Sequence, residues 1–220
     1  MSGDVSVLHV DDEPDVLNLS TQLFERAESD VSLVTAGNGP AGMAALDGHD
    51  VDCIVSDSVR MPDGESFVEA ASRRTDAPIV LFTAKQWNEV AGDALAADVS
   101  EYVRKAGKSD YRTVIDHVFQ LTDGSDDSDA TTAEDRRLVG WHDFSSTVEL
   151  GVSIAEAVEN VLDEDVTEFD PLYNTIDADT LESLLSPTTG GLQGEEIEVH
   201  FSYEGLDLIV TAQGTIHLDP

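Results

Sequence analysis

Isolated polar residues stand directly after short apolar runs in the first half of the chain; they are Asp11, Asp12, Asp57, Thr83 and Lys105. Carboxylates held close together repel one another unless a cation lies between them. Mg²⁺ prefers oxygen ligands and leaves coordination positions open for water and phosphate. A carboxylate can also accept a phosphoryl group as a nucleophile, while an amine and a hydroxyl neutralise the phosphoryl oxygens. These residue types therefore predict phosphoryl transfer to an aspartate.

The segments around these residues alternate between strand-like and helix-like patterns. The strand-like runs are 5–10, 31–36, 51–56, 78–82 and 99–104, and the helix-like segments are 14–24, 41–46, 64–71, 87–97 and 111–119. Such alternation predicts a doubly wound α/β domain with a five-stranded parallel sheet, ending near residue 121. Ligand sites in these sheets form beyond the carboxyl ends of the strands. The polar residues should therefore meet at one edge.

This arrangement resembles the response-regulator receiver domain over about residues 5–121. Besides the polar residues, the resemblance rests on Met61-Pro62-Asp63-Gly64, on Ala84 after Thr83, and on Tyr102 before Lys105. It implies a flavodoxin-like fold in which Asp57 accepts a phosphoryl group from a histidine kinase. Such a protein is a switch rather than an enzyme with its own substrate, limited to self-phosphorylation and autodephosphorylation at Asp57.

The same resemblance implies a role for each site residue. Asp12, Asp57 and the backbone carbonyl of Val59 would bind Mg²⁺ directly, and Asp11 would act partly through water. Lys105 and Thr83 would contact the phosphoryl group. Thr83 and Tyr102 would then switch together and change the surface of the fourth helix, fifth strand and fifth helix.

Two positions bear on how this site would work. The family usually has proline after its lysine, whereas this chain has Ala106, which predicts a trans peptide bond and an altered placement of Lys105. Val59 offers no polar side chain to guide a hydrolytic water. We therefore expect a long-lived phosphoryl group.

The second half of the chain reverses the order of elements. Residues 122–138 are polar and acidic and predict a flexible linker. For residues 139–220 we expect a smaller α+β domain, with two helices on a three-stranded antiparallel meander. Ser153 is the expected cap of the first helix, and Asp177 or Asp179 of the second.

Residues 148–218 are similar to the halobacterial output domain. The similarity rests on four segments, which are 154–158, 170–173, 176–181 and 199–203 followed by Gly205. It implies a small α+β domain that is attached to receivers or stands alone, with no established activity.

Composition limits the partners. The chain has 46 Asp and Glu against 11 Lys and Arg, a net charge of −35, which disfavours direct nucleic-acid binding. The acids are spread along the chain, as expected for a protein adapted to a salt-rich cytoplasm, where screening removes the repulsion. The resemblance to the halobacterial output domain separately implies a halophilic archaeon. A single cysteine, Cys53, and no signal peptide or membrane-spanning stretch predict a cytoplasmic protein.

The sequence leaves the output open. Our first hypothesis is an output domain that contacts a protein partner under control of the receiver. The alternatives are a ligand-sensing domain, a transcription-regulating domain, and a receiver that acts as a phosphate-independent binding module. A monomer and a homodimer are both compatible with the sequence.

Overall fold

The computed structural model describes residues 5–27, 31–107, 109–122, 136–162, 167, 169–186 and 197–219. The chain divides into two compact units, residues 1–134 and 135–220. Residues 123–135 of the expected linker lie outside the described residues. The linker was expected to extend to residue 138, but Arg137 and Leu138 pair with another strand and belong to the second unit.

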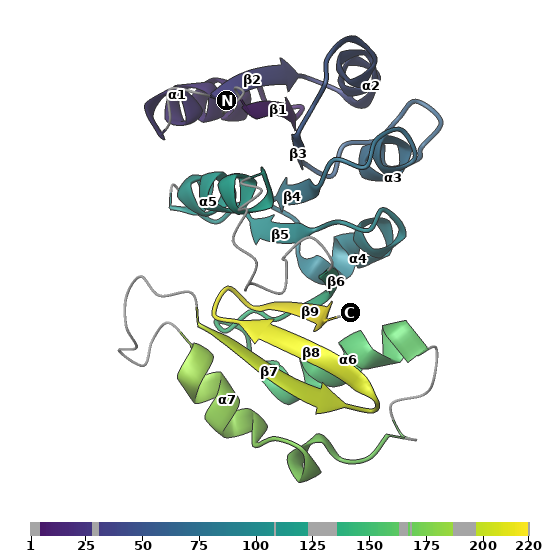
Figure 1. The fold of residues 1–220 in the computed structure, drawn as a ribbon, viewed down its shortest axis with the longest axis vertical. Helices are drawn as coiled ribbons and strands as arrows, with labels where there is room; N and C mark the ends of the chain where they lie inside the picture. Colours follow the sequence, from purple (N-terminus) through teal and green to yellow (C-terminus); the bar gives the residue numbers. More distant parts are fainter. Residues whose placement is uncertain are drawn as a thin grey trace. The chain divides into compact units, whose positions relative to one another are not determined.

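The first unit alternates strands and helices along its whole length. Its elements are β1 (Val5–Val10), α1 (Pro14–Ala27), β2 (Val31–Ala36), α2 (Gly39–Gly48), β3 (Cys53–Ser56), α3 (Phe67–Ser72), β4 (Ile79–Thr83), α4 (Trp87–Ala96), β5 (Glu101–Arg104) and α5 (Asp110–Thr122). The five strands form a parallel sheet in the order β2-β1-β3-β4-β5. Helices α1 and α5 lie on one face of the sheet and α2, α3 and α4 on the other (Figure 1). The predicted doubly wound fold is confirmed.

Burial on both faces explains why the central strands are continuous apolar runs. Val7, Leu8 and Val10 of β1 are fully buried, and every residue of β4 is buried. Helices cover both faces of a parallel sheet, so successive side chains are mostly apolar; His9, Ser56 and Thr83 are buried polar exceptions in these strands. The polar residues at the ends of these strands mark where the apolar runs end, although Asp11 and Thr83 are themselves buried.

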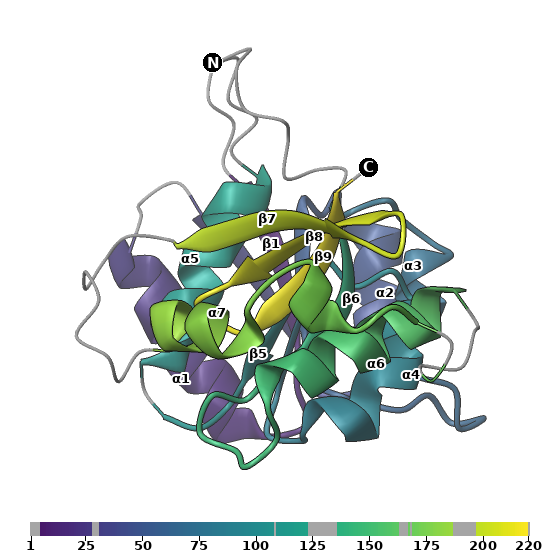
Figure 2. The same cartoon turned by 90° about the horizontal axis from the view of Figure 1, so that it is seen from below.

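The second unit is a four-stranded antiparallel sheet with two α-helices. Its elements are β6 (Arg137–Trp141), α6 (Leu150–Leu162), the 3₁₀ helix η3 (Leu172–Asn174), α7 (Ala178–Leu185), β7 (Glu198–Tyr203), β8 (Leu206–Thr211) and β9 (Thr215–Asp219). The strand order is β6-β9-β8-β7. Helices α6 and α7 lie on one face of this sheet (Figure 2). Their buried side chains and those of the strands form a single apolar core.

The sheet has one strand more than the predicted meander, because β6 pairs with β9. This strand contains Gly140, and a glycine inside a strand normally weakens it. In the structure a Cβ at Gly140 would lie 2.8 Å from the Cβ of Ala157, so the glycine permits α6 to pack closely on the strand. Gly140 argued against a strand in the sequence, but the packing of α6 on this strand requires it.

One of the two predicted helix starts is correct. Asp177 caps α7 by accepting a hydrogen bond from the backbone N–H of Thr180. Ser153, by contrast, lies inside α6, where its Oγ is 2.9 Å from Nδ1 of His142. The N–H of Leu150 at the start of α6 donates instead to Glu182 of α7, 3.1 Å away, so the cap comes from another helix.

The core of the second unit allows a matched test of burial on α6. Val158 is fully buried in this core, whereas Val152 is 45% exposed on the same helix. We expect Val158→Ala to lower the free energy of unfolding of this unit by about 2 kcal/mol, through lost transfer energy and a residual cavity. Val152→Ala should change it by less than about 0.5 kcal/mol. Urea titration followed by Trp141 fluorescence in a Trp87→Phe background measures both; equal effects would contradict the packing.

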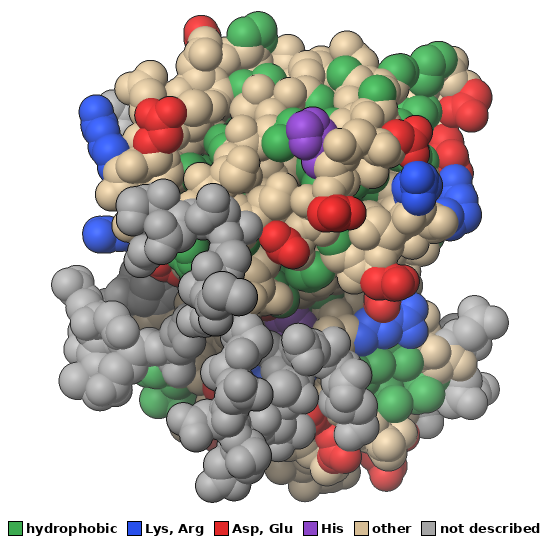
Figure 3. Space-filling model, turned by 45° about the horizontal axis from the view of Figure 1, so that its top comes forward, with side chains coloured by type: hydrophobic (Ala, Val, Ile, Leu, Met, Phe, Trp, Pro, Cys, Tyr) green, Lys and Arg blue, Asp and Glu red, His purple; other side chains and the backbone are tan. Residues whose placement is uncertain are grey.

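The described surface carries its negative charge in many places. Acidic side chains appear at separate points across the visible face rather than in one block (Figure 3). Among the described residues, no helix has the length and apolar character needed to cross a membrane.

Candidate functional site

Strand order brings the predicted site residues together at one edge of the parallel sheet. Asp11 and Asp12 follow β1, and Asp57 follows β3, which is the neighbour of β1. Thr83 is the last residue of β4, and Lys105 follows β5. The connection order reverses between β1 and β3, the place where α/β sheets form ligand sites.

Three carboxylates form a cluster at this edge. One oxygen each from Asp11, Asp12 and Asp57 lies within 4.8 Å of the others. Asp11 is fully buried, Asp57 is partly buried and Asp12 is exposed. Burial raises the pKa of Asp11, and its hydrogen bond from Lys105 only partly offsets this. An all-oxygen donor set open to solvent on one side fits Mg²⁺, which would also stabilise the ionised form of Asp11.

Asp57 is held by hydrogen bonds to both of its oxygens. Oδ1 accepts from the backbone N–H of Ser58 at 2.5 Å and from the Ser58 hydroxyl at 3.2 Å. Oδ2 accepts from Nζ of Lys105 at 2.8 Å. Burial opposes ionisation, but the hydrogen bonds from Lys105 and Thr83 outweigh it and lower the pKa of Asp57. This side chain is therefore an oriented, ionised carboxylate.

Lys105 joins Asp57 to Asp11. Its side chain is 10% exposed, and Nζ also donates to Oδ2 of Asp11. Burial lowers the pKa of Lys105, but the two carboxylates more than compensate and raise it, so the amine is charged. No described peptide bond is cis, as predicted for Lys105–Ala106, and Lys105 nonetheless reaches Asp57.

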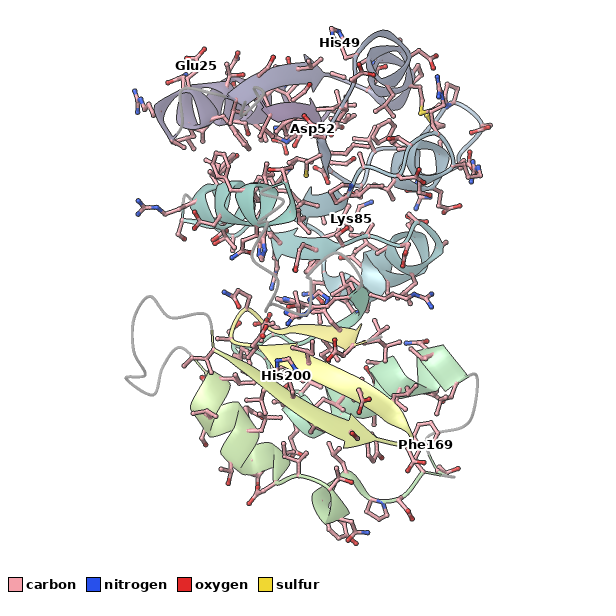
Figure 4. All side chains as sticks on the ribbon, in the orientation of Figure 1. Glu25, His49, Asp52, Lys85, Phe169 and His200 are labelled. Carbon is pink, nitrogen blue, oxygen red and sulfur yellow. The ribbon has the colours of Figure 1, made fainter. Side chains whose placement is uncertain are left out.

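The backbone of Lys85 links the predicted switch residues. Its N–H donates to Oγ1 of Thr83 at 3.3 Å, and its carbonyl accepts from the Tyr102 hydroxyl at 2.6 Å. Lys85 follows β4 and precedes α4, and its side chain is exposed (Figure 4). Tyr102 itself is buried, with the Trp87 ring against it at 5.3 Å between centroids. A movement of Thr83 can therefore reach Tyr102 through one residue.

The sequence did not point to two of these contacts. Ser58 touches both Asp57 and Thr83, with 3.3 Å between the Ser58 and Thr83 hydroxyl oxygens. Its position next to Asp57 was the only available signal. The backbone bridge through Lys85 had no signal, because any residue type can supply N–H and C=O groups.

Comparison with known families agrees with this geometry. Residues 7–116 match the response regulator receiver domain. The chain belongs to the response regulator receiver family. Residues 146–220 match halobacterial output domain 1, so the receiver is followed by a halobacterial output domain.

Similar solved structures cover the receiver domain. The signal receiver domain of an HD domain-containing protein from Pseudomonas fluorescens Pf-5 is 17% identical, with 56% of this chain and 90% of that chain covered and a TM-score of 0.50. The chemotaxis response regulator CheY4 of Vibrio cholerae is 22% identical, with 52% and 98% covered and a TM-score of 0.45. A receiver domain protein from Clostridium thermocellum is 18% identical, with 54% and 94% covered and a TM-score of 0.46. No curated protein matches the chain.

Proposed function

We propose that this response regulator accepts a phosphoryl group on Asp57 from a histidine kinase and relays that state to its output domain, which contacts a protein partner. The observation that carries the proposal is the 2.8 Å contact between Nζ of Lys105 and Oδ2 of Asp57, beside the three-carboxylate cluster. This arrangement combines an oriented nucleophile, a fixed cation and a set of metal ligands at one edge of the parallel sheet.

In the proposed transfer, an oxygen of Asp57 forms a bond to phosphorus as the P–N bond of the kinase phosphohistidine breaks. The imidazole leaves with its electron pair and takes up a proton. Lys105 and Thr83 then hold the phosphoryl oxygens by charge and by hydrogen bonding. Mg²⁺, held by Asp11, Asp12, Asp57 and the Val59 carbonyl, would supply further charge neutralisation. The Val59 carbonyl already accepts from the N–H of Phe67 at 2.9 Å and retains a second lone pair for a metal.

The signal would leave the site through Thr83. A phosphoryl dianion on Asp57 offers new acceptors to the Thr83 hydroxyl. Turning of Thr83 weakens its bond from the Lys85 N–H, and the Lys85 carbonyl carries the change to Tyr102. The affected surface is that of α4, β5 and α5.

Acetyl phosphate as the donor tests acceptance without knowledge of the kinase. With Mg²⁺ in molar KCl, we expect the intact mass to increase by one phosphoryl group, located on Asp57 by peptide mapping. A chain that remains unmodified although it binds Mg²⁺ would favour the phosphate-independent binding module.

The output is tested by capture from a salt-adapted cell lysate, with and without beryllofluoride as a phosphoryl mimic. Proteins recovered only with the mimic support a controlled protein partner. Recovery that ignores the state of Asp57 argues against phosphate control, and recovery of DNA or a small ligand instead would favour a transcription-regulating or ligand-sensing domain.

Val59 provides a prediction about the lifetime of the phosphoryl group. Its side chain is apolar and 9% exposed, so nothing on it orients a water toward the phosphorus. Val59→Asn should accelerate autodephosphorylation by roughly tenfold, measured as loss of the added mass after the donor is removed. Val59→Ala is the matched apolar control and should leave the rate within about twofold. Unchanged or slower hydrolysis in the asparagine variant would contradict the prediction.

A further inference from the structure

The loop that carries Lys105 is fastened to the start of α5 by one carboxylate. Oδ2 of Asp110 accepts the backbone N–H groups of Ala106 and Gly107, each at 2.6 Å. Oδ1 of the same residue accepts the hydroxyl of Ser109 at 3.0 Å. Both oxygens of Asp110 are therefore engaged within this loop.

These bonds differ from ordinary capping of a helix. A capping side chain accepts N–H groups that follow it in the chain, and so satisfies the first turn of its own helix. The donors here precede Asp110 by four and three residues, so the bonds close the loop rather than cap α5. Charge-assisted hydrogen bonds of this length are among the stronger ones in proteins.

The two sides of Lys105 are consequently anchored by different elements. On one side, the Lys105 N–H donates to the carbonyl of Thr83 at 2.8 Å, which ties it to β4. On the other side, the next N–H along the chain, that of Ala106, donates to Asp110 at 2.6 Å and also to the Arg104 carbonyl at 3.0 Å. A proline at position 106 would have no N–H to give. The Lys105 side chain is long and flexible, so its backbone anchors decide how often Nζ lies at Asp57.

We propose that Asp110 is a positioning residue for Lys105 and thereby sets the affinity of the site for a phosphoryl group. This inference rests on the proposed function, because it assigns Lys105 to the phosphoryl oxygens. Asp110 has no contact with the carboxylate cluster in the described residues, so its effect should be on the phosphoryl group and not on metal binding.

The test compares two affinities in the full-length chain. Calorimetry gives the dissociation constant for Mg²⁺ alone and then for beryllofluoride at saturating Mg²⁺. We expect Asp110→Ala to weaken beryllofluoride binding about tenfold and to leave Mg²⁺ binding no weaker than in the wild type. Asp110→Asn keeps an acceptor oxygen without the charge, so its dissociation constant for beryllofluoride should lie between those of the wild type and Asp110→Ala. This variant also guards against a folding defect in the alanine variant.

Asp116→Ala is the matched control, since this exposed aspartate lies on the same helix and its replacement changes the net charge equally. Asp116→Ala should change neither the dissociation constant for Mg²⁺ nor that for beryllofluoride. Equal beryllofluoride affinity in wild type and Asp110→Ala would overturn the inference. Parallel weakening of Mg²⁺ and beryllofluoride would also overturn it, because that pattern indicates general distortion. A wild-type chain that binds Mg²⁺ but no beryllofluoride would instead overturn the proposed function.

Discussion

Asp57→Asn is expected to lower the rate of phosphorylation by acetyl phosphate at least about 10³-fold. The amide has nearly the shape of the carboxylate and can still accept the Ser58 N–H, so the fold should be kept. It has no charge and is not a nucleophile toward phosphorus. The measurement is intact mass against time, with Mg²⁺ saturating.

The same variant should lose the conformational response. Trp87 lies against Tyr102, so its fluorescence in a Trp141→Phe background reports on the switch. We expect beryllofluoride to change this signal in the parent and not in Asp57→Asn. Asp50→Asn, at an exposed aspartate, controls for the loss of one charge. Phosphorylation that persists in Asp57→Asn at another residue would refute the assignment of the acceptor.

Lys105→Ala should affect the two ligands of the site in opposite directions. The ammonium group lies 2.8 Å from Oδ2 of Asp57 and would compete with a bound metal for the same carboxylates. Its removal should tighten Mg²⁺ binding about tenfold, because one repelling charge is lost. In the proposed function it also removes a charge-assisted donor to the phosphoryl group, so beryllofluoride should bind roughly thirtyfold more weakly.

Calorimetric titration with each ligand measures both effects of the Lys105 substitution. Lys85→Ala is the matched control, because this exposed lysine has the same side chain and contributes only its backbone to the switch. Weaker Mg²⁺ binding in Lys105→Ala would mean that the lysine organises the carboxylates rather than competing for them.

Much of the receiver fold could be predicted from its strands. Val7, Leu8 and Val10 lie close together in one short strand, and all three are buried. Such a run of apolar residues indicates a strand that is covered on both faces of its sheet. The second unit was less predictable, because the signals for β6 and for the start of α6 depended on partners far away in the chain. Gly140 is required because Ala157 packs against it, and the first turn of α6 is capped by the carboxylate of Glu182.

The sequence by itself determined which chemical groups this protein has at the ends of its strands, because the apolar runs stop there and polar residues stand out. Only the tertiary structure decided which of those groups touch. Strand order placed Asp57 beside Asp11, and the backbone of Lys85 joined Thr83 to Tyr102. Nothing in the sequence singled out Asp110, whose carboxylate binds the N–H groups of Ala106 and Gly107 in the folded chain. Nearly every residue offers the same backbone N–H and C=O groups, so which of them bind one another or a side chain outside a standard helix cap appears only when the chain is folded.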